Sequence, residues 1–217
     1  MTATAGSLVG LLVGRVSSTL CRIYGPNCSG GNAAGPGRFR TPAVTGITLI
    51  LFAAAYARYG FARQYFVSVV FASVMVAVAA VDIETYRIPN CLVTCGTVAL
   101  ASLTAAGFLP LRPSVAGALA GGLVMLIAAA ASRGGMGAGD VKVSFVIGGF
   151  VGWPAITLAL FTGFGMAAVA GLILMALRLK GRRDVIPFGP FLAAGGIIAE
   201  LFASPVLSWY LSRVVSA

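Results

Sequence analysis

Long apolar runs, broken by very few charged residues, constrain this chain more than any other feature of its sequence. Of its 217 residues, 59% are hydrophobic and only 9% are charged, whereas a typical soluble domain carries about 25% charged residues. So few charges cannot cover the surface of a water-soluble fold. The runs are also too continuous for the alternating pattern of a membrane β-barrel. The sequence therefore predicts an all-α membrane protein, a polytopic helical bundle that forms one domain over 1–217.

Eight candidate transmembrane helices follow one another along the chain. A helix needs about 20 apolar residues to cross the hydrocarbon core, and the first and sixth candidates are shorter than this. The expected spans lie near 5–20, 42–58, 64–84, 90–108, 114–132, 141–153, 155–177 and 186–212.

The basic residues indicate orientation in the membrane. The net charge is +10, but it is spread singly and in small clusters, and no basic helix is interleaved with aromatic residues as in a nucleic-acid-binding protein. With the N-terminus outside and eight spans, eleven of the 15 Lys and Arg residues fall inside and four outside. The positive-inside rule then predicts that both termini lie outside. Because no positive charge precedes the first apolar run, we expect a retained helix there and not a cleaved signal peptide.

Two of the five acidic residues are expected to meet at one membrane face. Asp82 falls within the third span, where a charge is costly and marks a functional site. Pro89 disfavours helical geometry at Ile88, so the helix ends there and Asp82 lies about one turn inside the cytoplasmic boundary. Asp140, 58 positions later, lies at the start of the sixth span on the same side.

The stretch "GGMGAGDVK" surrounds the second of these carboxylates. Glycine allows positive φ and close approach to another chain, so Gly137 and Gly139 can deliver Asp140 to the start of a helix and leave room for a peptide. Two opposed carboxylates can share a proton, one activating water and the other protonating the leaving group. The chain has no histidine, which removes the usual general base and most metal sites. The pattern predicts aspartic-protease chemistry without a cofactor.

Three motifs, in the expected order, resemble the type IV prepilin peptidases, which are membrane aspartic proteases with a Gly-x-Gly-Asp motif. The stretch "DIETYRIPN" resembles the family's first aspartate followed by Ile-Pro-Asn, and "GMGAGDVK" its Gly-x-Gly-Asp-x-Lys core. A third stretch, "IPFGPFLAAGG", resembles the start of its last helix. The matching positions are Asp82, Ile88, Pro89 and Asn90, then Gly137, Gly139, Asp140 and Lys142, then 186–196.

This resemblance implies that Asp82 and Asp140 are catalytic. It implies a substrate, a prepilin or pseudopilin, that is cut after a glycine and before its hydrophobic helix, at the cytoplasmic face of a bacterial plasma membrane. The peptidase core is expected over 64–212, and 1–60 matches only loosely. The residues expected to shape the site or bind substrate are Gly137, Gly139, Lys142, Arg87, Pro89 and Asn90.

The cysteines do not form a typical zinc site. Cys21 and Cys28 are seven positions apart, and Cys91 and Cys95 four, so neither pair is the CxxC that such sites favour. We expect free thiols, with the second pair packed in the core, and a degenerate metal loop at Cys21 and Cys28 is the alternative. Larger family members carry two CxxC pairs that bind zinc in this loop, and they also methylate the new N-terminus of the pilin. The resemblance therefore implies peptidase activity for this chain and leaves open whether it also has methyltransferase activity.

Three other interpretations compete with this one. The aspartates could form structural ion pairs with Arg87 or Lys142, or Lys142 could serve Ser144 as a nucleophile. Glu200 lies 12 residues past Phe188, about 18 Å along a helix, and is expected to be hydrogen-bonded inside the bundle, away from the pair. A small proton- or cation-coupled transporter or channel would instead line a path with all three carboxylates. Transporters often show repeated halves, and no convincing internal repeat is visible.

Overall fold

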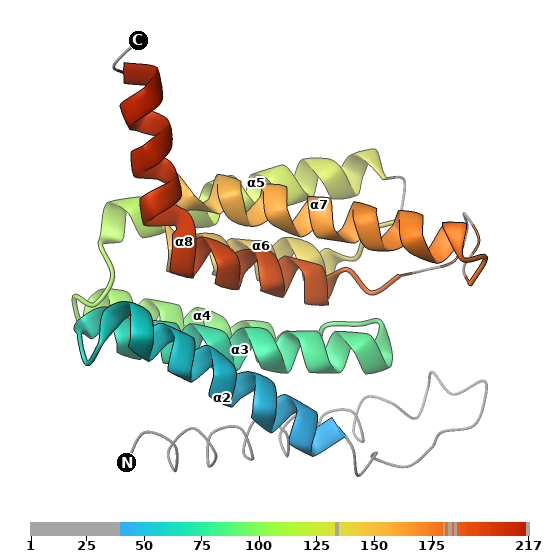
Figure 1. The fold of residues 1–217 in the computed structure, drawn as a ribbon, viewed down its shortest axis with the longest axis horizontal. Coiled ribbons are helices and arrows are strands. Elements are labelled where there is room, and N and C mark those ends of the chain that lie inside the picture. The colour runs from blue at the N-terminus through green and yellow to red at the C-terminus, as the bar shows by residue number, and fades with distance from the viewer. Residues whose placement is uncertain (1–39, 133–134, 180, 182–183, 185, 216–217) are drawn as a thin grey trace.

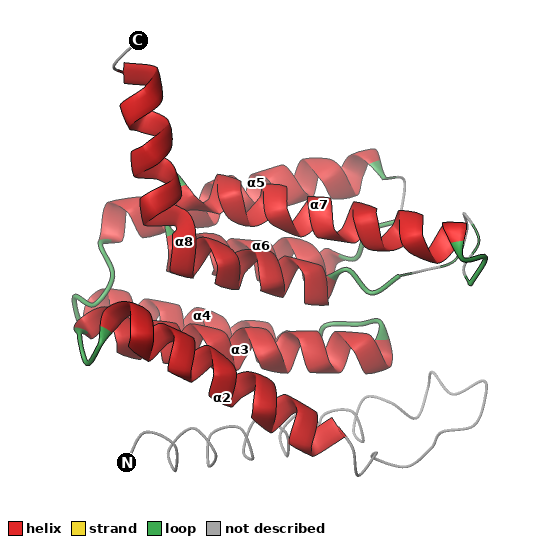
Figure 2. Ribbon diagram, viewed as in Figure 1, coloured by secondary structure: helices red, strands yellow, loops and turns green. Residues whose placement is uncertain are grey.

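The computed structural model describes residues 40–132, 135–179, 181, 184 and 186–215. Over these residues helices are the only regular secondary structure, as the composition predicted, and short loops and turns join them (Figure 2). The expected span at 5–20 and the loop with Cys21 and Cys28 lie outside them. The helices are α2 (Arg40–Tyr59), α3 (Arg63–Thr85), α4 (Asn90–Ala105), α5 (Leu111–Ala131), α6 (Ala138–Val151), α7 (Ala155–Ala176) and α8 (Gly189–Val215).

Five of these helices, α2, α3, α5, α7 and α8, are long and apolar enough to cross a membrane. The protein is therefore an integral membrane protein, but the expected count of eight spans is not confirmed. α4 has 16 residues and α6 only 14. At 1.5 Å per residue α6 measures about 21 Å, which is less than the roughly 30 Å of the hydrocarbon core.

The short helix α6 occupies the centre of the bundle. It packs against α4, α5, α7 and α8, while α3 packs against α2, α4 and α8. Figure 1 shows α5 to α8 on one side and α2 to α4 on the other, all lying roughly alongside one another. The core between the two groups is filled by fully buried Phe71 and Met75 from α3, Ile147 from α6 and Leu192 from α8. A charged residue at the start of α6 is therefore held among other helices.

The closest helix contact joins α5 and α6 through two glycines. A Cβ on Gly117 would overlap the carbonyl oxygen of Gly148, and a Cβ on Gly148 would overlap that of Gly117. Small residues at such crossings let backbones approach closely, which is a main source of helix association in membranes. This contact fixes α6 along α5.

The last helix bends away from the bundle. Pro205 lies inside α8, and Figure 1 shows the C-terminal part of that helix turning steeply from the rest. Proline removes one helical hydrogen bond and clashes with the preceding turn, which accounts for the bend. The N-terminal part of α8, which begins at Gly189, is the part that packs in the core.

Candidate active site

Asp82 lies in the last turn of α3 and is only 5% exposed. The helix stops at Thr85 because Tyr86 adopts a left-handed conformation (φ 52°), and its N–H donates to the carbonyl oxygen of Asp82 at 2.8 Å. The chain then passes Ile88 and starts α4 directly after Pro89. The predicted break before the proline is confirmed.

The first residue of α8 is the hydrogen-bond partner of Asp82. The N–H of Gly189 donates to Oδ2 of Asp82 at 2.8 Å. A Cβ at position 189 would lie 2.7 Å from the same oxygen, so the carboxylate reaches this helix N-terminus only because the residue is glycine. Free N–H groups and the helix dipole make such a terminus a favourable place for an anion.

Gly189 was not among the residues predicted to form the site. The stretch 186–196 was expected only to resemble the start of the family's last helix. The proline directly after this glycine, at the start of an apolar run, was the available signal, because proline favours the first positions of a helix.

Asp140 is the third residue of α6 and is 9% exposed. Burial, together with the charge of Asp82, raises the pKa of Asp140 to about 6. A hydrogen bond from the backbone of Gly137 acts in the opposite direction. Asp82 and Asp140 are thus electrostatically coupled although they come from different helices, which is the arrangement expected of a pair that shares one proton.

The ion-pair alternative does not describe these carboxylates. Among the described residues, neither Asp82 nor Asp140 pairs with Arg87 or Lys142. Lys142 instead donates from Nζ to Oδ1 of Asn90 at 2.8 Å. This bond ties the N-terminal part of α6 to the first residue of α4.

The two motifs also contact each other through a glycine. A Cβ at Gly139 would lie 3.1 Å from Cβ of Ile88, closer than a side chain tolerates without movement. Gly137 has a φ of −77° and Gly139 is helical, so the expectation that these glycines supply positive φ is wrong. Glycine is needed at position 139 because the chain at Ile88 approaches closely there. This close approach brings the start of α6 against the segment between α3 and α4.

The remaining predicted residues surround this contact. The side chain of Arg87 is exposed, and its backbone is held by Oγ1 of Thr85, while Pro89 is buried. Ser144 donates to the carbonyl oxygen of Gly121 at 3.0 Å, and Lys142 is bonded to Asn90. The Ser–Lys alternative therefore has no support in the geometry.

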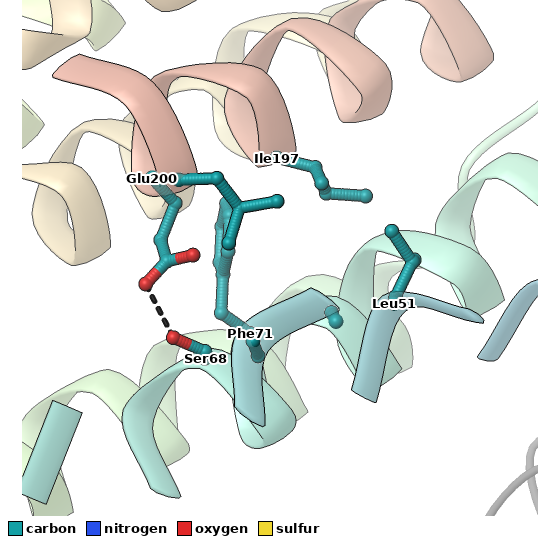
Figure 3. A pocket seen from close by; sticks show the side chains of 8 residues that line it. Leu51, Ser68, Phe71, Ile197 and Glu200 are labelled. Atoms are coloured by element: carbon teal, nitrogen blue, oxygen red, sulfur yellow. Dashed lines mark hydrogen bonds between the residues drawn. The ribbon is translucent and has the colours of Figure 1, made fainter. Parts of the chain in front are cut away.

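Glu200 lies far from the aspartates, as expected. It follows Gly189 by 11 positions on α8, a distance of about 16 Å along the helix. Figure 3 shows its carboxyl group beside Ser68 of α3, at one side of a small cavity that Phe71 also lines.

No metal site is evident in the part of the chain that the structure describes, where no three His, Cys, Asp or Glu side chains gather. Cys91 is half-buried and Cys95 is exposed, and both are free thiols. The expectation that this pair packs in the core is wrong for Cys95, because that side of α4 faces outward.

Comparison with known proteins agrees with the motifs. The model of the type IV leader peptidase family matches residues 69–175, a range that contains Asp82 and Asp140. A prepilin leader peptidase/N-methyltransferase from Bacillus subtilis is 35% identical over 181 residues, which cover 82% of this chain and 72% of that protein.

Further relatives of the same name match over smaller shares of their length. One from Legionella pneumophila is 27% identical over 81% of this chain and 63% of its own. One from Aeromonas salmonicida is 36% identical over 50% of this chain and 39% of its own. No solved structure matches the chain.

Proposed function

The chain belongs to the type IV leader peptidase family, and on that premise we propose that it is an aspartic endopeptidase that removes the leader peptide from prepilin-like precursors. The observation that carries the proposal is the pair of buried carboxylates at the end of α3 and the start of α6, coupled through the charge of Asp82. Asp82 and Asp140 are its catalytic residues.

The surroundings of the two groups suggest different roles. The N–H of Gly189 holds Oδ2 of Asp82, which leaves Oδ1 to take a proton from the attacking water. Asp140, with its raised pKa, supplies a proton to the leaving amine. The proton that Asp82 gains then passes to Asp140, which restores the starting state, so the reaction balances without a cofactor.

The other predicted residues receive supporting roles in this proposal. Gly139 lets α6 approach Ile88, and the Lys142–Asn90 hydrogen bond keeps the starts of α4 and α6 together. Gly137, Pro89 and exposed Arg87 border the place where a peptide would lie. The relatives' names also include N-methyltransferase, and the proposal for this chain is confined to the peptidase.

The transporter alternative receives no support from the spacing of the carboxylates. A proton or cation path would distribute them through the membrane. Asp82 and Asp140 are instead coupled at one end of the bundle, and between Gly189 and Glu200 the helix α8 is packed with buried Leu192 and Ala193.

The test is co-expression of a candidate prepilin with the wild type, Asp82→Asn or Asp140→Asn. Loss of either carboxylate removes the shared proton, so we expect processing to fall by about 10²–10⁴-fold while membrane insertion is unchanged. Asp184→Asn is a matched control, since this exposed carboxylate accepts a hydrogen bond from the loop N–H of Gly181, away from both aspartates. Processing at the wild-type rate by Asp82→Asn would refute the assignment.

We further propose eight spans in a bacterial plasma membrane, with the active site facing the cytoplasm and both termini outside. The support is the excess of basic residues on one side. A reporter fused at Gly181 should be cytoplasmic, and one fused after the last residue should be outside. A cytoplasmic C-terminus would mean that the number of spans is odd.

A further inference from the structure

An apolar groove of about 460 Å³ opens between α4 and α5, with α6 between them. Val93 of α4, Leu119 and Leu123 of α5 and Phe145 of α6 are among the residues that line it. α6 packs against both neighbours, while α4 and α5 are not a closely packed pair. The groove is the gap that α4 and α5 leave between them over the shorter helix α6.

The groove begins at the catalytic end of α6. Val141 and Lys142, which line it, directly follow Asp140. Lys142 and its partner Asn90 make this end polar. Beyond it, the lining is almost entirely apolar, over about 10 Å of α5 between Leu119 and Leu126.

The apolar walls are left without a partner inside the described bundle. Leu119 is 60% exposed and Leu123 57% exposed. A groove that is polar beside a catalytic carboxylate and apolar further on matches a peptide with the same order of properties. Such a peptide is polar where it is cut and becomes an apolar helix directly afterwards, and helices commonly bind by laying an apolar face into a groove.

We propose that this groove between α4 and α5 binds the apolar helix of the precursor next to the scissile bond. The inference rests on the proposed peptidase function and adds where the substrate lies. Lipid chains are the competing occupant. They are not expected to bind this groove in preference to other lipid-facing surfaces of the protein.

Gly122 offers a way to fill the groove without disturbing the bundle. It lines the groove on α5, and a Cβ there would lie 3.4 Å from the ring of Phe145, an ordinary contact. Its neighbours differ, because a Cβ at Gly117 or Gly121 would strike the backbone of α6. A larger side chain at 122 therefore extends into the groove.

The experiment compares Gly122→Leu with Gly165→Leu, since a Cβ at Gly165 of α7 meets nothing within 4 Å. In purified enzyme, Gly122→Leu should raise KM for a helix-bearing precursor by about tenfold with little change in kcat, the pattern of lost substrate binding. Gly165→Leu should behave as the wild type. An unchanged KM in Gly122→Leu, or a fall in kcat alone, would overturn the proposal.

A photo-crosslinking amino acid at Leu119 gives an independent readout, with Leu172 of α7, which is 66% exposed, as the control site. The precursor should be captured from position 119 and not from 172. Capture of lipid alone, or equal capture from both sites, would overturn the proposal. If the wild type fails to cleave any prepilin, the peptidase function itself fails, which is a separate result.

Discussion

Helices α3 and α8 pack against each other, and a carboxyl group lies at each end of the region where they are in contact. The surroundings of these two carboxyl groups differ. Asp82 is held by one backbone N–H, from Gly189, and is coupled to a second carboxylate. Glu200 is surrounded by side chains from α2 and α3, with Ser68, Tyr59 and Gln64 within hydrogen-bonding reach. Tyr59 also donates to the carbonyl oxygen of Glu200 at 2.7 Å.

The hydrogen-bond partners of Ser68 bear on the protonation of Glu200. The Ser68 hydroxyl lies 2.9 Å from the carbonyl oxygen of Gln64 and also next to Oε1 of Glu200 (Figure 3). One hydroxyl hydrogen cannot serve two acceptors. A protonated Glu200 removes the conflict, because it donates to Ser68 and Ser68 donates to Gln64.

The neighbours of a carboxyl group decide its role. Glu200 has its hydrogen-bonding capacity used by fixed partners, beside a cavity of only about 10 Å³, room for a single water. One oxygen of Asp82 accepts a hydrogen bond from Gly189, and the charge of Asp82 acts on Asp140. The first arrangement fastens helices together, and the second leaves an oxygen available for chemistry.

The same chemical change at the two sites should separate them most clearly. Asp82→Asn should reduce cleavage by about 10²–10⁴-fold, because an amide cannot accept the proton of water. Glu200→Gln keeps an N–H donor for Ser68 and should stay within about twofold of the wild type. Prepilin processing rates in membranes measure both. Loss of activity in Glu200→Gln at normal expression would place Glu200 in the chemistry.

Adding one methyl group beside Asp82 should have the next largest effect. In Gly189→Ala the new Cβ would lie 2.7 Å from Oδ2 of Asp82, so the carboxylate must move. A displacement of about 1 Å can cost about 10²-fold in rate, and we expect a loss of that order in kcat. Gly165→Ala adds the same methyl group in open space and serves as the control. Wild-type kcat in Gly189→Ala would show that the Gly189 contact is dispensable.

The pH dependence should follow Asp140 and not Glu200. Burial and the charge of Asp82 raise the pKa of Asp140 from 3.8 to about 6, so a proton on Asp140 is present below that pH and is lost as the pH rises beyond it. We expect kcat/KM to fall by about tenfold per pH unit above this value. Glu200→Gln should leave this limb of the profile in place, and a shifted limb in that variant would contradict the comparison.

Removing the second carboxyl group entirely should affect stability more than catalysis. Glu200→Ala leaves buried Ser68 without one partner, which should lower the free energy of unfolding by about 1–3 kcal/mol. Glu200→Gln should lose less. Thermal unfolding in detergent measures the difference, and equal melting temperatures for wild type and Glu200→Ala would argue against the proposed fastening of α8 to α3.

The meeting of Asp82 and Asp140 could be anticipated because local rules decide it. Pro89 predicts a break in the chain shortly after one helix, and the glycine-rich stretch precedes another helix start. The partners of Glu200 and Asp82 could not be anticipated in this way. Ser68 lies 132 positions from Glu200 and Gly189 lies 107 from Asp82, and both contacts depend on how α8 packs against α3. The count of eight spans is not confirmed, because α6, which the sequence already predicted to be short, has only 14 residues.

The backbone contact between Gly117 and Gly148 has a consequence for depth in the bilayer. A helix of about 21 Å has no hydrophobic length that matches the membrane, so α6 cannot set its own vertical position. α5, with 21 residues or about 31 Å, does match. Since the two helices are fixed to each other at this crossing, the level at which Asp140 meets the water is determined by α5. The thickness of the surrounding lipid therefore acts on Asp140 through a helix that carries neither aspartate, whereas Asp82 lies on α3, which is itself long enough to cross the membrane.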